Sequence, residues 1–337
     1  MTKGTGLPDI KELEQRIFRI GSQEEFQQAA WGAFLYQYET NPLYRHFCDL
    51  LKADPQKVRG LDQVPFLPVE MFKNHRILAG NQTWEKVFRS SGTTGMERSS
   101  HYIHRLELYR KSFLKGFESF YGSVQDYCIL ALLPGYTDNP DSSLIYMVQQ
   151  LIREGGHPES GFFPNDPGSL VKKLRELEKR GQKTLLLGVS FALLEMAERY
   201  QVTLKNTIVM ETGGMKGRRA EITREELHHK LTKSFDLQSI HSEYGMAELL
   251  SQAYSQGDGR FRTPPWMKVF IRDYYDPFHL VEPGKSGGIN IIDLANLHSC
   301  PFIETKDIGK LHPNGSFEVL GRFDNSDVRG CNLMAYI

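Results

Sequence analysis

The run Ser90-Ser91-Gly92-Thr93-Thr94-Gly95 is the part of this sequence whose residue types most clearly suit chemistry. Its hydroxyl side chains come in pairs separated by glycine, so main-chain N–H and side-chain O–H groups can converge on anionic oxygens without hindrance from a Cβ atom. The run has neither the Gly-Lys-Ser/Thr of a Walker A loop nor the Gly-x-Gly-x-x-Gly spacing of dinucleotide-binding folds. Taken alone, it predicts either a phosphate-binding loop or an ordinary exposed turn.

Further polar and glycine-containing segments follow this run in order. They are Glu211-Thr212-Gly213-Gly214, His241-Ser242-Glu243-Tyr244-Gly245-Met246-Ala247-Glu248, Glu304-Thr305-Lys306-Asp307 and Gly321-Arg322-Phe323-Asp324. Together with the first run, which continues to Glu97 and Arg98, they resemble the ordered motifs of the adenylate-forming superfamily of acyl-CoA synthetases, luciferases and peptide-synthetase adenylation domains. This resemblance implies use of ATP and Mg²⁺ to activate a carboxylic acid as an acyl-adenylate.

The resemblance also implies a nucleotide site. In it, residues 90–95 handle the ATP phosphates, and Gly213 and Gly214 lie on the adenine side. Three residues of the third motif, Tyr244, Gly245 and Met246, are expected to contact the nucleotide, although a core-facing position explains the tyrosine nearly as well.

Charged residues in these motifs suit the same chemistry. Glu248 is placed to hold Mg²⁺, which prefers carboxylate and phosphate oxygens, and Asp307 offers acceptors for a ribose diol. Arg322 supplies a rigid donor fork for ribose or phosphate, unless it and Asp307 form only a surface ion pair. Arg98 is a catalytic candidate that replaces the usual lysine. Lys306 replaces a usual glycine, and it is either a solvated lysine or a substitute for the lysine of a lid domain.

The ending of the chain narrows the resemblance. The large superfamily continues into a mobile lid domain, whereas this sequence stops at Ile337, so we expect no lid. The layout and the ending Asp327-Val328-Arg329-Gly330-Cys331-Asn332-Leu333 resemble the acyl-protein synthetase family, the LuxE-type fatty-acid ligase component of bacterial fatty acid reductase. That resemblance implies a fatty acid substrate, capture of the acyl group by Cys331, and an acyl-accepting reductase or acyltransferase partner.

Thiol chemistry agrees with such a role for Cys331, because a thiolate attacks a mixed anhydride readily and the resulting thioester stays activated. A small buried apolar residue is the alternative. Cys128 falls inside an apolar run and is expected in the core, while Cys48 and Cys300 have no motif around them. The four cysteines show no CxxC spacing, which argues against a zinc site and a disulfide framework and favours reduced thiols in the cytoplasm.

The elements that must position these residues alternate along the chain. Helices are expected over 23–38, 105–121, 142–153, 169–179, 191–200 and 219–233, with strands over 84–89, 127–133, 184–187 and 207–210. Strands separated by helices predict an α/β fold whose mostly parallel sheets are flanked by helices. Strands over 267–272, 288–293 and 316–320 predict a small antiparallel, barrel-like subdomain near the C-terminus.

We therefore divide the chain into an α/β adenylate-forming core with an N-terminal helical segment, 1–240, and a unit of nucleotide motifs and β-strands, 241–337, that ends at the hinge motif. The segment 188–194 follows a strand end and is expected either to wall an acyl pocket or to form an ordinary helix face. The acid itself is either fatty or aromatic.

Composition excludes some classes of function. The 337 residues include 41 Lys and Arg against 41 Asp and Glu, so no overall field favours nucleic acid or an anionic membrane. The sequence has no signal-peptide pattern and no apolar stretch long enough to span a bilayer, which predicts a cytoplasmic protein. Two alternatives stay open: an acid–CoA ligase acting without its own lid, and a non-catalytic nucleotide-binding subunit of a reductase complex.

Overall fold

The strands between residues 128 and 255 form a mostly parallel sheet. The structure is a computed structural model and describes residues 9–90, 98–135, 139–164, 166–213 and 222–323. The strand order of the sheet is β5-β4-β6-β7-β8-β9, and all neighbours are parallel except β8 and β9. The strands are β4 (Cys128–Leu132), β5 (Gly161–Phe162), β6 (Thr184–Val189), β7 (Thr207–Thr212), β8 (His241–Tyr244) and β9 (Ala253–Ser255). Every residue of β4 and β6 is buried, as expected for parallel strands covered on both faces.

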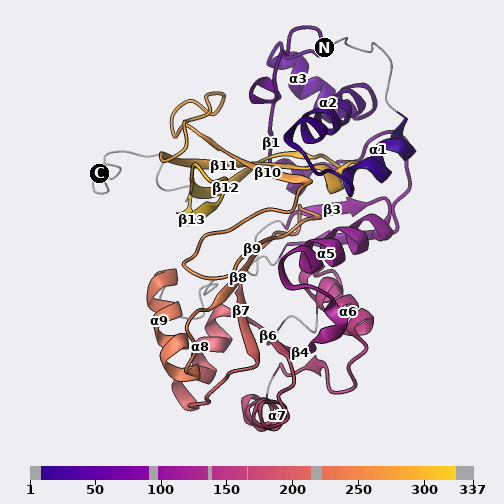
Figure 1. Cartoon of the computed structure of the whole chain (residues 1–337). Helices are drawn as coiled ribbons and strands as arrows, with labels where there is room; N and C mark the ends of the chain where they lie inside the picture. Colours follow the sequence, from indigo (N-terminus) through magenta and orange to yellow (C-terminus); the bar gives the residue numbers. More distant parts are fainter. Residues whose placement is uncertain (1–8, 91–97, 136–138, 165, 214–221, 324–337) are drawn as a thin grey trace.

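Helices flank this sheet on two sides, with α8 and α9 on one side and α5 and α6 on the other (Figure 1). They are α5 (Leu106–Tyr121), α6 (Ser143–Gly155), α7 (Pro167–Lys179), α8 (Ser190–Arg199) and α9 (Arg224–Phe235). Local sequence explains their ends. Ser142 caps α6, which stops at the left-handed Gly156, and Thr223 and Glu226 form a capping box at the start of α9.

A second sheet is largely antiparallel and carries the C-terminal motifs. It consists of β1 (Leu67–Pro68), β10 (Met267–Arg272), β11 (Ser286–Asp293), β12 (Phe302–Leu311) and β13 (Phe317–Arg322). The order is β1-β12-β11-β10, with β13 also paired to β12, so the sheet is open and β10 lies at its edge. Two further strands, β2 (Lys86–Arg89) and β3 (Ser100–Ile103), pair as a separate hairpin. They flank the Ser/Thr/Gly run in the sequence.

N-terminal helices pack against this second sheet, and they lie at the top of Figure 1. They are α1 (Ile10–Ile17), α2 (Gln23–Thr40), α3 (Pro42–Leu50) and α4 (Met71–Asn74), with short 3-10 turns η1 (Leu61–Gln63), η2 (Val124–Asp126) and η3 (Leu294–Asn296) elsewhere. Phe34 of α2 and Tyr44 of α3 both contact the ring of Phe302, at centroid distances of 6.2 and 5.9 Å.

Among the described residues, none of the helices combines the length and apolar character needed to cross a membrane.

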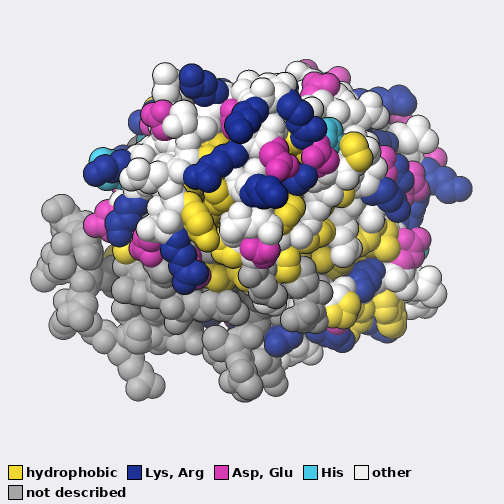
Figure 2. All heavy atoms as spheres, turned by 90° about the horizontal axis from the view of Figure 1, so that it is seen from below, with side chains coloured by type: hydrophobic (Ala, Val, Ile, Leu, Met, Phe, Trp, Pro, Cys, Tyr) yellow, Lys and Arg dark blue, Asp and Glu magenta, His cyan; other side chains and the backbone are white. Residues whose placement is uncertain are grey.

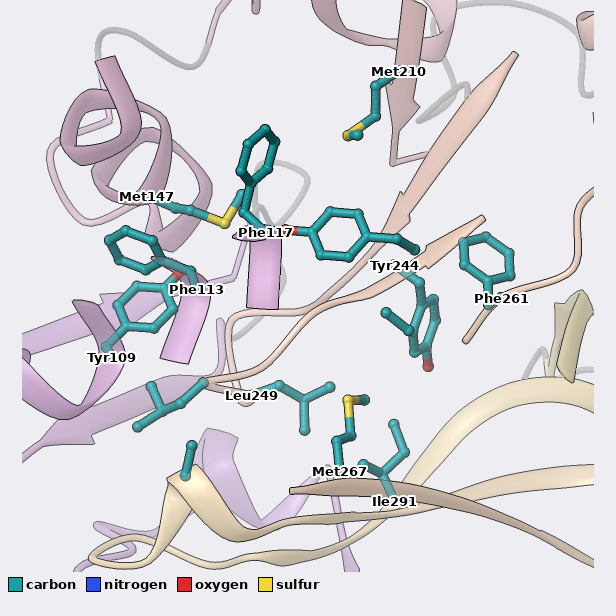
Figure 3. Close-up of a cluster of buried hydrophobic side chains, with 14 of the residues drawn as sticks. Tyr109, Phe113, Phe117, Met147, Met210, Tyr244, Leu249, Phe261, Met267 and Ile291 are labelled. Carbon is teal, nitrogen blue, oxygen red and sulfur yellow. The ribbon is translucent and has the colours of Figure 1, made fainter. Parts of the chain in front are cut away.

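Aromatic and sulfur side chains fill the interior between the two sheets. Figure 3 shows Tyr109, Phe113 and Met147 gathered beside Phe117, with Leu249, Met267 and Ile291 lying further toward the second sheet. The rings of Tyr109 and Phe113 are 5.0 Å apart and nearly perpendicular, an arrangement that aromatic quadrupoles favour. At the surface, Figure 2 shows Lys and Arg side chains interspersed with Asp and Glu, in keeping with the balanced composition.

The predicted alternation of strands and helices is confirmed, including helices at 106–121 and 143–155 and strands at 128–132 and 267–272. The longest strand, β12, was not expected, because polar residues at Glu304, Lys306 and Asp307 hide its pattern. The helix expected over 219–233 begins at Arg224 among the described residues. Chain division at residue 240 stays a prediction, since β8 and β9 belong to the first sheet and β1 to the second.

Glycine substitutions test this packing. A Cβ atom at Gly309 in β12 would lie 2.5 Å from the main-chain oxygen of Glu318 and 2.6 Å from Ile289 Cδ1, so Gly309→Ala should lower the free energy of unfolding by roughly 1–3 kcal/mol. Gly116 in α5 has open space around the same position, and Gly116→Ala should raise that free energy by about 0.5–1 kcal/mol. Urea unfolding of both variants measures the difference, and equal effects would contradict the close packing of β12 on β13.

Candidate functional site

A cleft with a volume of about 1420 Å³ lies where the carboxyl ends of β7 and β8 meet β12 and β13. Ligands of α/β sheets gather at such strand ends. Most described residues that the sequence assigned to the nucleotide line this cleft: Ser90, Gly213, Tyr244, Gly245, Met246, Glu248, Asp307 and Arg322. Residues that are distant in the sequence therefore converge on one cavity.

One other predicted residue lies outside the cleft, and the rest are not described by the structure. Arg98 is exposed and is not among the described lining residues, although its neighbour Ser99 is. Ser91, Gly92, Thr93, Thr94 and Gly95 lie outside the described residues, as do Gly214 and Cys331.

The ends of the Ser/Thr/Gly run are held by the β2–β3 hairpin. Arg89 pairs with Ser100 at the end of the hairpin, and Ser90 N donates to Ser99 O at 3.1 Å. Ser99 N donates in turn to Ser90 Oγ at 3.0 Å. Arg89 also forms an ion pair with Asp141, which directly precedes the cap of α6. Ser90 and Ser99 consequently enter the cleft from a defined frame.

Tyr244 and Asp307 join the two sheets across the cleft. The phenol of Tyr244, at the end of β8, donates to Asp307 Oδ2 on β12 at 2.7 Å. Burial raises the pKa of the Asp307 carboxyl, while the hydrogen bond from Tyr244 and the positive charges of Arg322 and Arg272 act in the opposite direction. Burial is the larger effect.

Arg322 stands opposite Asp307 in the register of β12 and β13. Its Nε lies 3.9 Å from Asp307 Oδ1, and its side chain is 67% exposed, so the ion pair is long and open to solvent. A guanidinium in this position is available to a ligand that lies in the cleft, because little would be lost by exchanging the weak contact with Asp307.

Glu248 lies on the loop that follows β8, and its side chain is almost entirely buried beside the cleft. Burial raises the pKa of its carboxyl, and a hydrogen bond with the Ser99 side chain partly offsets this. The carboxylate thus meets the hairpin that frames the Ser/Thr/Gly run.

A buried polar frame, missed from the sequence, holds the loop of Glu248. Asp293 accepts hydrogen bonds from Leu250 N and Ser251 N at 2.8 and 2.9 Å and from Ser251 Oγ at 2.6 Å. Asn296 Nδ2 donates to the carbonyl of Glu248 itself at 2.8 Å. These side chains come from the end of β11 and from η3, so the second sheet anchors a loop that belongs to the first.

His101 of β3 completes this frame. Its Nδ1 lies 2.8 Å from Ala247 O, and its Nε2 lies 2.9 Å from Asn296 Oδ1. Burial lowers the pKa of His101 to about 4, outweighing the two contacts, which act to raise it. Its signal in the sequence is weak, since a single histidine in a short strand has no accompanying motif.

The segment 211–213, predicted to lie on the adenine side, is held by charged neighbours. Glu211 at the end of β7 is buried, accepts from Ser190 Oγ at 2.9 Å and lies 3.3 Å from Arg224 Nε. The His228 ring is 3.7 Å away. Although burial acts to raise it, the pKa of Glu211 is lowered by His228, Arg224 and Ser242 together. Gly213 adopts a φ of 66° and its carbonyl accepts from Ser190 Oγ at 2.7 Å, which fixes the turn that opens toward the cleft.

The segment expected to wall an acyl pocket packs in the core instead. Within the described chain, the cleft lining includes none of residues 188–194. Gly188 lets α8 approach β4, since a Cβ atom there would lie 2.8 Å from Leu193 Cγ and 3.3 Å from Leu132 Cβ. Of the two alternatives, the ordinary helix face is the one observed. Apolar lining comes from α5 and α6, through Tyr109, Leu144 and Met147.

Comparisons with known proteins agree with this geometry. A family model described as acyl-protein synthetase, LuxE, matches residues 19–135. A long-chain-fatty-acid–luciferin-component ligase from Vibrio harveyi is 24% identical over 326 residues, which cover 90% of this chain and 85% of that protein. The chain is similar to LuxE acyl-protein synthetases in both comparisons. The relationship supports a ligase of the fatty acid–protein ligase type.

Solved structures of other proteins have a fold similar to that of this chain. ATP-bound MatB from Rhodopseudomonas palustris superposes with a TM-score of 0.53 at 17% identity, covering 70% of this chain and 47% of MatB. A 2-hydroxyisobutyryl-CoA ligase in its postadenylation state gives a TM-score of 0.60 at 13% identity, with 96% and 74% covered. The chain therefore has the α/β fold of adenylate-forming enzymes and spans about half the length of MatB.

The cysteines that the structure describes are poor nucleophiles. Cys48, Cys128 and Cys300 are all buried. Burial raises the pKa of Cys48 to about 12 and also raises the pKa of Cys128 and Cys300. Since the thiolate is the reactive form, none of these three is prepared for acyl transfer. The expectation that Cys128 packs in the core is confirmed.

Lys306 forms an ion pair with Glu70 at 2.5 Å, and both residues line the cleft. The side chain is 25% exposed, so it is neither fully solvated nor sealed in the core. Its assignment as a substitute for a lid lysine stays a prediction.

The carboxylates of the cleft are compatible with a magnesium–nucleotide complex. No group of three or more His, Cys, Asp or Glu side chains suited to hold a metal occurs among the described residues. Mg²⁺ at nucleotide sites commonly takes only one or two carboxylates and completes its shell with phosphates and water. Glu248, buried beside the cleft and near Ser99, fits that limited role.

Replacing Tyr244 tests the bond between the sheets. Tyr244→Phe removes a donor to the Asp307 carboxylate, so the pKa of Asp307 should rise further above its ordinary value. At neutral pH the free energy of unfolding should fall by roughly 1.5–3 kcal/mol, the range for a hydrogen bond to a charged group, and this loss should shrink in acid as Asp307 is protonated.

Carbon NMR titration of labelled aspartate and urea unfolding across pH measure these two effects. Tyr109→Phe is the matched control, because the Tyr109 hydroxyl donates to Ser143 O and does not touch Asp307. An unchanged Asp307 titration in Tyr244→Phe would contradict the assignment of this hydrogen bond.

Proposed function

We propose that the chain uses ATP to convert a carboxylic acid into an acyl-adenylate and that the acyl group then passes to Cys331 as a thioester. The observation that carries the first step is the convergence of Ser90, Tyr244, Glu248 and Asp307 on one cleft at the strand ends. The name of the Vibrio harveyi relative supports a fatty acid as the substrate class.

In the first step a carboxylate oxygen of the acid attacks the α-phosphorus of ATP, and the bond to pyrophosphate breaks. Asp307 would bind the ribose hydroxyls, since a carboxylate presents acceptors to a diol. Tyr244 would hold the Asp307 carboxylate in place through its hydrogen bond. Arg322 is placed to meet the developing negative charge, because its exposed guanidinium makes a long ion pair, at 3.9 Å, with Asp307. Glu248 would hold Mg²⁺, which neutralises phosphate charge when bound with ATP.

In the second step the Cys331 thiolate attacks the acyl carbon, the carbon–oxygen bond to the phosphate breaks, and AMP leaves. Support comes from the family relationship and from the burial of Cys48, Cys128 and Cys300, whose raised pKa values disfavour them as acceptors. The thioester would keep the acyl group activated for a reductase or acyltransferase partner. Unpaired cysteines suit the reducing cytoplasm, where we place this reaction.

Pyrophosphate exchange tests the first step. The wild-type chain with ATP and Mg²⁺ should exchange labelled pyrophosphate with at least one acid in a panel of fatty and aromatic acids. Glu248→Gln and Asp307→Ala should lower the exchange rate by about 10- to 100-fold, the kinetic equivalent of one charge-assisted hydrogen bond. Glu282→Gln, at an exposed position away from the cleft, is the control. Absence of exchange with every acid would favour a non-catalytic nucleotide-binding subunit.

Acyl labelling tests the second step. Incubation with a labelled acid and ATP should leave hydroxylamine-sensitive label on the denatured protein, and Cys331→Ala should abolish the label while pyrophosphate exchange continues. Cys128→Ala, which alters a buried thiol beside Ser160, should keep the label. Label that survives Cys331→Ala would refute this cysteine as acceptor.

A further inference from the structure

Gln252 has a buried amide oxygen that finds no partner in the part of the chain that the structure describes. It lies on the loop after β8, four residues beyond Glu248, and its side chain is 5% exposed. Its Oε1 is sealed from solvent and accepts no hydrogen bond, yet the residue lines the cleft. An unpaired buried acceptor costs free energy, and such groups usually mark a ligand or a functional contact.

Several other polar side chains that line the cleft are engaged within the protein. Tyr109 donates its hydroxyl to Ser143 O at 3.1 Å, and Ser142 Oγ caps α6 by accepting from Ile145 N at 3.3 Å. Thr212 donates its hydroxyl to Glu243 Oε2. Within the described residues these side chains do not supply the missing partner of Gln252, and a ligand that enters the cleft is one source of it.

A second acceptor lies beside Gln252. A Cβ atom added at Gly245 would lie 2.5 Å from Glu243 Oε1 and 3.4 Å from Gln252 Cγ, so the two side chains border the same small space. Glu243 is 7% exposed and also lines the cleft. A carboxylate and an amide oxygen together make this corner rich in acceptors.

The walls next to this corner are apolar. Tyr109, Leu144 and Met147 line the cleft on the side of α5 and α6, and Figure 3 shows Tyr109 and Met147 close together beside Phe113. The negative charge of Glu243 is among the causes that raise the pKa of Tyr109, after burial, which places the carboxylate within electrostatic reach of this wall. A ligand lying along the wall would end against the acceptors.

We propose that the acid activated by this chain carries a hydrogen-bond donor on its hydrocarbon part, a hydroxyl or an N–H group, that binds Gln252 Oε1 in the corner next to Glu243. The inference rests on the proposed function, because it concerns the acid half of the same cleft. It differs from recognition of a plain alkyl chain, which would leave the buried acceptor unpaired. A site built around a buried polar group discriminates strongly against an analogue that lacks the matching group.

Pyrophosphate exchange with matched acids tests the inference. The probes are octanoic acid and benzoic acid. Each is compared with its derivatives that carry one hydroxyl or amino group, placed at different positions to give a set of isomers. We expect one donor-bearing isomer to exceed its parent acid in kcat/KM by about 10-fold or more in the wild type. Gln252→Met, which keeps the length and removes the acceptor, should erase this preference, mainly by lowering kcat/KM for the donor-bearing acid.

Gln150→Met is the matched control. Gln150 in α6 also has a buried Oε1 with no partner among the described residues, but it does not line the cleft, so its replacement should leave the preference unchanged. Thermal unfolding of both variants checks that they fold.

The outcomes separate this inference from the proposed function. Exchange with unsubstituted acids at rates equal to or above those of every hydroxy and amino isomer would overturn the inference and leave acid activation intact. A preference that persists in Gln252→Met would also overturn it. A chain that exchanges with no acid would overturn both.

Discussion

The hydrogen bond from Tyr244 to Asp307 connects two sheets that are otherwise built from different parts of the chain. Tyr244 ends a parallel strand and is buried, while Asp307 lies in the longest antiparallel strand and is largely but not fully buried, with 15% of its side chain exposed. A buried carboxylate is stable only when its oxygens are hydrogen-bonded or paired with charge. The position of β12 relative to β8, and with it the shape of the cleft, depends on meeting that requirement.

Buried polar groups in this region fall into two kinds. Asp293, Asn296 and His101 make their hydrogen bonds within the protein and hold the loop of Glu248 against the second sheet. Gln252 on the same loop is unsatisfied within the described chain. The first kind explains why the loop keeps its conformation, and the second indicates what the loop is shaped to receive.

Much of the architecture was predictable from periodicity. Buried apolar runs such as 128–132 and 184–189 alternate with amphipathic helices, and this pattern alone predicts a covered parallel sheet. Motif residues were found because their types and order are distinctive, and eight of those described line one cleft. Tertiary partners were not predictable in the same way: Asp293 and His101 act through contacts with residues 42 to 195 positions away, which no local pattern reports.

Local polarity also concealed structure. No strand was predicted over β12, whose motif residues Lys306 and Asp307 face the cleft in place of apolar ones, and the apolar segment 188–194 left a pocket wall and an ordinary helix face equally open. In both places the sequence shows residue character without showing what lies opposite. Only the pairing of β12 with β11 and the approach of α8 to β4 decide the matter.

Calorimetric titration with a non-hydrolysable acyl-adenylate analogue shows whether one cleft binds the nucleotide and the acid together. An acyl sulfamoyl adenosine should bind the wild-type chain at least about 100-fold more tightly than AMP or the free acid, because an analogue of the intermediate gains both sets of contacts at once. Asp307→Ala should remove most of that advantage. Binding of the analogue no tighter than that of AMP would contradict a shared cleft for nucleotide and acid.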